Sequence, residues 1–109
     1  MTTDQYRHLA LSFHGVEEVP HFDHPSFRYK GKIFATLWEK ENRAMLKLTP
    51  GDQSVFCGYD KQTFFPVPGS WGKKGATFVE LSSVREDMFL DALATAYDGV
   101  SSKKDRKKP

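Results

Sequence analysis

Cysteine is almost absent from this chain, since Cys57 is the single one among 109 residues. One thiol cannot form a disulfide within the chain, and an unpaired thiol is typical of a reducing compartment. Cys57 follows Val55 and Phe56 near the expected end of a helix. This apolar setting favours a buried, unreactive thiol. We therefore expect a cytoplasmic protein whose fold depends on its core and not on disulfides.

Long apolar runs are also lacking. A membrane-spanning helix needs about 20 largely apolar residues, whereas Lys, Glu, Pro or Gly interrupts each apolar stretch here within a few positions. Residues 1–18 lack the basic region, apolar core and small-residue cleavage site of a secretory signal. The length suits one domain. We expect a single domain over residues 1–98 and no association with a membrane.

Sequence motifs for catalysis are missing as well. The chain has no glycine-flanked serine, phosphate loop or dinucleotide fingerprint. Glu17 and Glu18 are adjacent, so their side chains point in different directions and suit paired acid–base work poorly. His21, Asp23 and His24 are of types that bind zinc or iron, but their spacing fits no metal motif and equally suits a turn. We expect no enzymatic activity, no cofactor and no metal site.

Positive charge is small in total and unevenly distributed. The net charge is +2, but residues 99–109 hold five basic side chains against one acidic, a net +4. Residues 1–98 then hold 11 basic and 13 acidic side chains, a net −2. A short, charged, apolar-poor segment is typical of disorder. We expect residues 99–109 to be a basic, disordered tail that aids solubility or attracts anions nonspecifically.

What the chain does contain is a series of well-marked helices and strands. Thr2 and Gln5 form a possible capping box before apolar residues at positions 6, 9, 10 and 13, the spacing of an amphipathic helix. His14-Gly15 should end this helix. Residues 16–26 show no periodicity and are expected to form a loop.

Three strands should follow the loop. Apolar and polar residues alternate in segments 27–30 and 44–48, and the segment IFATLW at 33–38 is expected to be the strand between them. With turns at Gly31-Lys32 and at residues 40–43, these segments predict an antiparallel meander. Thr49 as the cap and Pro50 as the first residue predict a short helix that ends near Cys57.

The remaining elements complete the predicted fold. Residues 63–68 contain two prolines and fit an edge strand, residues 76–81 fit a last strand, and the loop GSWGKKG lies between them. Ser83 and Glu86 form a second possible capping box, before a helix that Gly99 should end. The order α-β-β-β-α-β-β-α predicts a two-layer α+β fold, in which helices at both termini pack on one face of an antiparallel sheet of about five strands.

Three phrases of the sequence, PHFDHPSFRYKGKIFATLW, NRAMLKLTP and FFPVPGSWGKKGATFVEL, resemble the MmcQ/YjbR family of small bacterial proteins. The similarity runs from about Leu9 to Tyr97. It implies an α+β fold related to the frataxin/CyaY architecture, and a DNA-binding role with a double-wing arrangement. Two positions depart from the family's pattern: Ala76 stands where Trp is common, and His14 stands where proline is usual.

The charges of the strands and of the last helix have opposite signs. Residues 24–49 hold six basic and two acidic side chains, whereas residues 82–98 hold one basic and four acidic. Because helices should cover one face of the sheet, we expect the strand cations on the other face and the carboxylates in the helix layer. The outward residues predicted from strand alternation are Arg28, Lys30, Met45, Lys47 and Thr49, joined by Trp38 or Phe34.

Cations interleaved with exposed rings suit nucleic acid, since phosphates need positive charge and unpaired bases stack on aromatic side chains. In this interpretation the hairpins around Gly31-Lys32 and GSWGKKG act as wings, and Trp71 stacks or wedges. The residues predicted to meet phosphates are Arg28, Lys30, Lys32, Lys47, Lys73 and Lys74.

Other interpretations fit the same residues. Lysines on a sheet face also keep it solvated and resist edge-to-edge aggregation, and a large ring in a hairpin often folds back onto its own domain. The main alternative is a protein-interaction or regulatory domain, in which Trp38, Trp71 and Met45 form an apolar hot spot. A binder of acidic small molecules, or an enzyme, is a third class.

Overall fold

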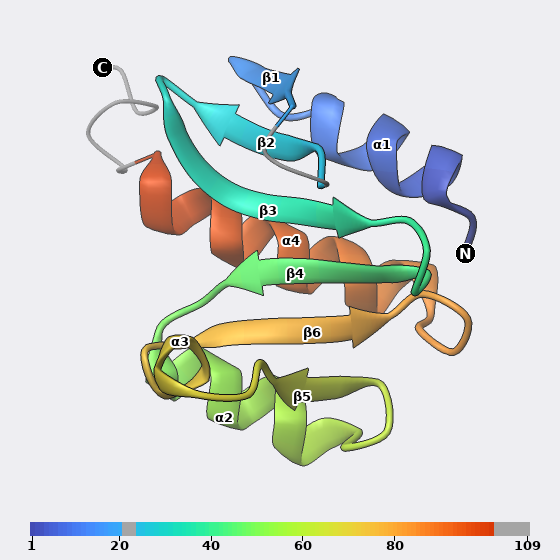
Figure 1. The fold of residues 1–109 in the computed structure, drawn as a ribbon, viewed down its shortest axis with the longest axis vertical. Helices are drawn as coiled ribbons and strands as arrows, with labels where there is room; N and C mark the ends of the chain where they lie inside the picture. The colour runs from blue at the N-terminus through green and yellow to red at the C-terminus, as the bar shows by residue number, and fades with distance from the viewer. Residues whose placement is uncertain (21–23, 102–109) are drawn as a thin grey trace.

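An open antiparallel sheet of six strands carries α1, α2 and α4 on one face in the computed structural model, which describes residues 1–20 and 24–101. The strand order is β1-β2-β3-β4-β6-β5. The strands are β1 (Val16–Val19), β2 (Ser26–Tyr29), β3 (Lys32–Trp38), β4 (Arg43–Lys47), β5 (Phe64–Pro66) and β6 (Ala76–Glu80), and the helices are α1 (Thr3–Leu11), α2 (Pro50–Tyr59), α3 (Ser70–Lys73) and α4 (Glu86–Val100). Figure 1 looks onto the face that the helices leave open, with α4 passing behind β3 and β4. The predicted α+β class and the antiparallel meander are confirmed.

The core lies between the sheet and the helices, and Tyr6 of α1 is at its centre. The Tyr6 ring packs edge-on against Phe89 of α4, with ring centroids 5.0 Å apart, and its hydroxyl donates a 2.8 Å hydrogen bond to the carbonyl of Thr36. Tyr6 is fully buried, and this burial raises its pKa well above the usual value. A neutral, hydrogen-bonded phenol therefore joins α1 to both α4 and the sheet.

The predicted loop at residues 16–26 was wrong in its first part, because Val16–Val19 forms an edge strand. This strand pairs antiparallel with β2, with Val16 opposite Tyr29 and Val19 opposite Ser26. The segment Val-Glu-Glu-Val does not alternate, and its two central glutamates conceal the strand from a period-of-two search. The sheet consequently has six strands, one more than expected.

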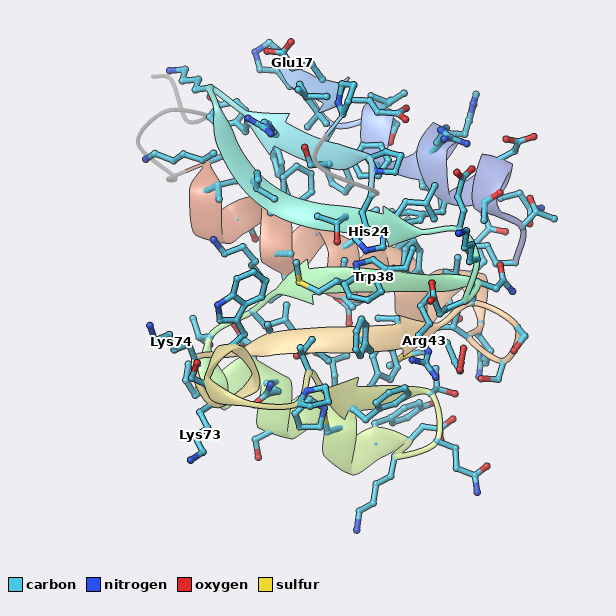
Figure 2. The ribbon with its side chains drawn as sticks, in the orientation of Figure 1. Glu17, His24, Trp38, Arg43, Lys73 and Lys74 are labelled. Atoms are coloured by element: carbon cyan, nitrogen blue, oxygen red, sulfur yellow. The ribbon has the colours of Figure 1, made fainter. Side chains whose placement is uncertain are left out.

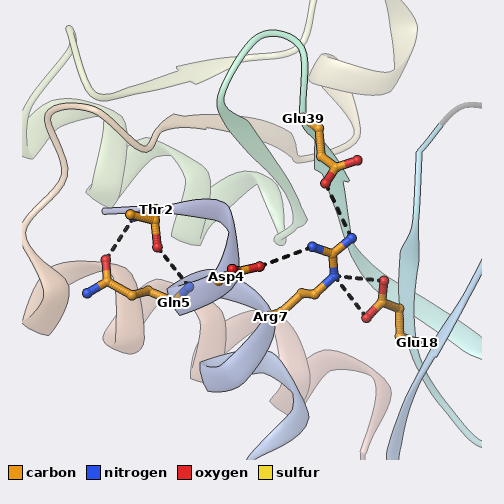
Figure 3. A network of polar contacts seen from close by, with 6 residues as sticks. All are labelled: Thr2, Asp4, Gln5, Arg7, Glu18 and Glu39. Atoms are coloured by element: carbon orange, nitrogen blue, oxygen red, sulfur yellow. Dashed lines mark hydrogen bonds and ion pairs between the residues drawn. The ribbon is translucent and has the colours of Figure 1, made fainter.

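An ion-pair network fixes β1 to α1 (Figure 3). The Arg7 guanidinium donates from Nε to Glu18 of β1 at 3.0 Å, and it also lies 3.4 Å from Glu39 and 3.6 Å from Asp4. The hydrogen bond to Glu18 is the largest of the effects that raise the pKa of Arg7. These contacts explain how a polar edge strand finds its place without a continuous apolar face.

The helix ends agree with the sequence at α1 and α2 but not at α4. The capping box of Thr2 and Gln5 is formed, and the Thr49 hydroxyl accepts from the N–H of Asp52 at the start of α2. In α4, by contrast, Arg85 is the N-cap and makes no side-chain cap. The predicted box of Ser83 and Glu86 is wrong.

Two predicted helix ends also shift. Helix α1 ends at Leu11, with Ser12 as its C-cap, three residues before the predicted His14-Gly15. Helix α4 continues through Gly99 to Val100. A Cβ at Gly99 would meet nothing within 4 Å. The basic residues of the predicted tail lie at positions 103–108, outside the described residues. No helix in residues 1–20 and 24–101 is long and apolar enough to cross a membrane.

A bulge in β3 decides which residues reach the open face. Phe27 pairs with Ala35 and Arg28 pairs with Ile33, so Phe34 has no partner in β2. Phe34 turns to the helix side, is fully buried and packs edge-on against Tyr97 of α4. Of the two rings considered for the open face, Trp38 lies there and Phe34 does not, because the extra residue shifts the alternation.

Candidate functional site

The open face contains a groove of about 460 Å³ between the end of the sheet and α3. Strands β3, β4 and β6 supply most of its walls, and α3 and the segment before β2 supply the rest. Its aliphatic lining residues are Ile33, Met45, Leu48 and Ala76. Met45 and Ala76 also belong to a small apolar cluster on this face, separate from the main core. The groove is therefore hollowed into an apolar surface that the helices do not cover.

A stacked pair of rings, His24 and Trp38, lines the groove. Their centroids are 3.9 Å apart and their planes differ by 9°, and Figure 2 shows the two together over the open face. The indole N–H of Trp38 donates to the Thr36 hydroxyl at 3.0 Å, and its ring packs edge-on against Phe78. The buried Nδ1 of His24 has no hydrogen-bond partner among the described residues. The hydrogen bond and the ring contact thus hold the indole in place, whereas Nδ1 of the stacked imidazole makes no hydrogen bond with the described residues.

Helix α3 holds Trp71 at the rim of the groove. Trp71 lines the groove but is 64% exposed. Gln53 of α2 holds the α3 turn in place. Its side-chain amide donates hydrogen bonds to the carbonyls of Gly72 and Ala76 at 2.9 and 3.0 Å. A Cβ at Gly72 would collide with the carbonyl of Val67. The GSWGKKG segment is consequently a fixed helical turn and not the simple hairpin loop expected from its glycines.

Two lysines give the groove its positive charge, and one arginine lies opposite a groove residue in the sheet. Lys47 of β4 and Lys74, which follows α3, both line it, and both are exposed. Arg28 lies opposite Ile33 in the register and is half-buried, with Nε donating to the Ser26 hydroxyl at 2.9 Å. The structure therefore brings together Lys47, Lys74 and Trp71, with Arg28 close to the same wall.

The other predicted phosphate-binding residues do not join the groove. Lys30 and Gly31 form a two-residue turn with positive φ of 50° and 82°, so the turn lies one residue before the predicted Gly31-Lys32. The Lys30 ammonium lies 5.5 Å from the ring centroid of Tyr29, a core residue. Lys32 is exposed beside this turn, and Lys73 points away from the sheet (Figure 2). Because β2 ends at Tyr29, Lys30 lies in the turn, and the strand position predicted for it is wrong.

Arg43 lies at the other end of the face from Lys73 and Lys74 (Figure 2). Its guanidinium lies 5.2 Å from the ring centroid of Phe65 and 5.3 Å from that of Phe78. Glu80 accepts a hydrogen bond from its Nε at 3.2 Å. With its charge paired and its plane on two rings, Arg43 stabilises the sheet and offers little to an anion.

The expected separation of charge between the two layers is incomplete. Glu80 lies opposite Arg43 in the register and pairs with it on the open face. Glu17 lies opposite Arg28 at the outer edge of the sheet. The expectation that carboxylates would gather in the helix layer is wrong at these two strand positions.

The cysteine and histidine predictions have different outcomes. Cys57 is a partly buried free thiol on α2, and burial raises its pKa, in agreement with an unreactive residue. His21 and Asp23 lie outside the described residues, so the structure does not bear on a ligand role that includes them. Within residues 1–20 and 24–101 no three His, Cys, Asp or Glu side chains are grouped to hold a metal ion.

The sequence alone did not identify His24 as part of the groove. His24 was considered, together with His21 and Asp23, as a metal ligand or as part of a turn, and no local signal indicates that it stacks on Trp38. Its contact with Trp38 depends on how the chain before β2 returns over β3, which no local pattern encodes.

These features define a small α+β domain with an aromatic, positively rimmed groove on its open face. The chain belongs to the YjbR family, whose model matches residues 11–99. The fold is similar to that of the Deinococcus radiodurans protein DR2400, which contains a DUF419 domain, with a TM-score of 0.80. The two sequences are 22% identical, and the similar region covers 94% of this chain and 80% of the other. No curated protein matches the sequence.

Proposed function

We propose that this domain is a non-catalytic nucleic-acid-binding module, which binds its ligand along the open face at the end of the sheet near α3. The observation that carries the proposal is the groove itself, which is lined by Trp71, Lys47 and Lys74 and by the stacked His24–Trp38 pair. Aromatic surfaces flanked by cations are what proteins use to hold bases and phosphates together.

The two connections expected to act as wings lie at the same end of the sheet. Figure 1 shows the β2–β3 turn and α3 at the end of the sheet where β3 begins and β4 finishes. Lys30 belongs to the first connection and Lys32 follows it at the start of β3, whereas Lys73 and Lys74 belong to the second. A strand of nucleic acid laid across the groove would pass between them, so the exposed lysines outside the groove add weaker contacts at its margins.

A protein partner on the same face has less support. In that alternative Trp38, Trp71 and Met45 would form the apolar anchor. Met45 is only 6% exposed, and Trp38 is partly covered by His24. Trp71 alone is left as a large exposed anchor, whereas hot spots usually cluster.

The proposal is tested by the salt dependence of binding. Labelled 12-nucleotide single and double strands would be titrated by fluorescence anisotropy between 50 and 200 mM salt. Contacts from Arg28, Lys47 and Lys74 predict a slope of log affinity against log salt of about −2 to −3, or about a 15- to 60-fold loss over this range. A full-length variant with the five basic residues at 103–108 changed to glutamine removes the nonspecific contribution of that segment.

A charge-matched pair of variants locates the site. The change Lys47→Gln with Lys74→Gln should weaken binding at least about 10-fold and reduce the slope by about 1 to 2. The control is Lys40→Gln with Lys61→Gln, two exposed lysines outside the groove. Equal losses in both pairs, or binding that disappears with the charges at 103–108 alone, would contradict the proposal.

A further inference from the structure

The size and polarity of the groove limit the kind of nucleic acid that it can bind under the proposed function. At about 460 Å³ it falls in the range of sites that enclose a small molecule, about 300–1,000 Å³. A paired and stacked base in a duplex has no free ring face to offer, whereas an unpaired base does. A groove with these dimensions suits one nucleotide unit better than the side of a double helix.

The lining matches the two kinds of surface that a nucleobase has. The aliphatic and aromatic walls suit the flat face of the ring, and the polar groups are few. His24 is one of the lining residues, and its Nδ1 is buried without a hydrogen-bond partner among the described residues. An unsatisfied buried polar atom is unfavourable in a folded protein. The edge of a base can supply the missing hydrogen bond if the imidazole turns on Trp38.

The charge at the mouth matches the rest of a nucleotide. Lys47 and Lys74 both reach the groove from different elements, β4 and the end of α3. Helix α3 is in turn fixed by the hydrogen bonds of Gln53 to Gly72 and Ala76. Two ammonium groups on a fixed frame beside an aromatic cavity favour an anion attached to a flat ring.

We infer that the groove receives one unpaired nucleobase of a single strand, with Lys47 and Lys74 on the adjoining phosphates, so that the domain discriminates single strands from duplexes. This inference rests on the proposed function and adds to it the strandedness and the base site. Trp71 and the His24–Trp38 pair are the rings on which the base stacks.

The test measures the contribution of the base to binding affinity separately from that of the sugar–phosphate backbone. One seven-nucleotide strand has abasic residues throughout, and a second is identical except for one central adenosine. Both have the same phosphates, so the salt-dependent binding of the abasic strand tests the proposed function alone. The single base should raise the affinity about 5- to 100-fold, the range expected for one stacked base.

Substitutions of the groove rings test whether the increase in affinity from the single base arises in the groove. Trp71→Ala and His24→Ala should each remove most of the difference in affinity between the two strands. His24→Phe keeps a ring on Trp38 and removes both nitrogens, so it should retain part of the gain if Nδ1 also bonds the base. Thermal unfolding followed by circular dichroism confirms that each variant is folded.

Each remaining outcome has a defined meaning. Equal affinity for the two strands, or for a single strand and its duplex, would overturn the base site while leaving the proposed function in place. Failure of both strands to bind would overturn both. Competition by AMP and not by inorganic phosphate supports the base site, whereas AMP binding more tightly than the adenosine-containing strand would assign the groove to a free nucleotide and overturn the inference for strands.

Discussion

Single residues of the α3 turn determine where Trp71 lies. Of the three glycines between residues 69 and 75, Gly69 and Gly75 have a positive φ and Gly72 does not. Gly72 is required instead because the Val67 carbonyl occupies the space of a side chain. The close approach allows the turn to pack on the chain that leaves β5.

The first prediction follows from this contact. Gly72→Ala should lower the free energy of unfolding by about 1–3 kcal/mol, the usual cost of forcing an extra methyl into a packed site. Gly58→Ala is the matched control, because Gly58 lies in α2 and a Cβ there meets nothing within 4 Å. The control should stabilise the protein by about 0.5–1 kcal/mol. Urea unfolding measures both, and equal effects of the two substitutions would contradict the close-packing explanation.

At the scale of elements, the part of the fold that could be predicted is the part with local signals. Thr2 and Gln5 marked the start of α1, and Thr49 with Pro50 marked the start of α2. Alternation at residues 27–30 and 44–48, with the turns around residues 33–38, identified the three strands of the meander. Each of these signals lies within a few residues of the feature that it specifies.

The elements that the sequence missed depend on distant contacts. Strand β1 exists because β2 offers it an edge and because Arg7 binds Glu18 across 11 positions of the chain. The α3 turn is fixed by Gln53, 19 residues before Gly72. No pattern among neighbouring residues indicates either contact, so neither element could be predicted from the local sequence.

The second prediction tests the connection between α1 and β1. Arg7→Met keeps the aliphatic stem, and it should destabilise the fold by about 1–2 kcal/mol because Glu18 is left partly buried without its partner. The Arg7 and Glu18 side chains are 29% and 27% exposed, whereas those of the Arg85–Asp87 pair are 69% and 66% exposed. Arg85→Met should therefore cost less than about 0.5 kcal/mol.

Hydrogen exchange adds a local readout to this comparison. In Arg7→Met the amides of β1 should exchange faster, because the edge strand has lost its main contact with α1. Wild-type exchange rates for the β1 amides in Arg7→Met would show that the network does not hold the strand. An equal loss of unfolding free energy in Arg85→Met and Arg7→Met would show the same.

At the scale of the whole molecule, the candidate site could be predicted only in outline. The idea of a basic, aromatic open face identified Lys47, Lys74 and Trp71, which the groove brings together. It failed at Lys30, because the exact strand end was not visible in the alternation. It gave no indication of the groove, since a cavity arises from three strands and two connections packing together.

The last prediction uses the separation between the two faces. The main core lies on the helix side, whereas Trp71 projects from the other side and is 64% exposed. Trp71→Ala should change the free energy of unfolding by less than about 0.5 kcal/mol and yet weaken single-strand binding about 10-fold. Leu93→Ala, which empties a fully buried position of α4, should cost about 2–5 kcal/mol. Below its unfolding temperature, this variant should bind as the wild type does. If Trp71→Ala destabilises the domain as Leu93→Ala does, the ring is a support of the fold and the open face is not an independent binding surface.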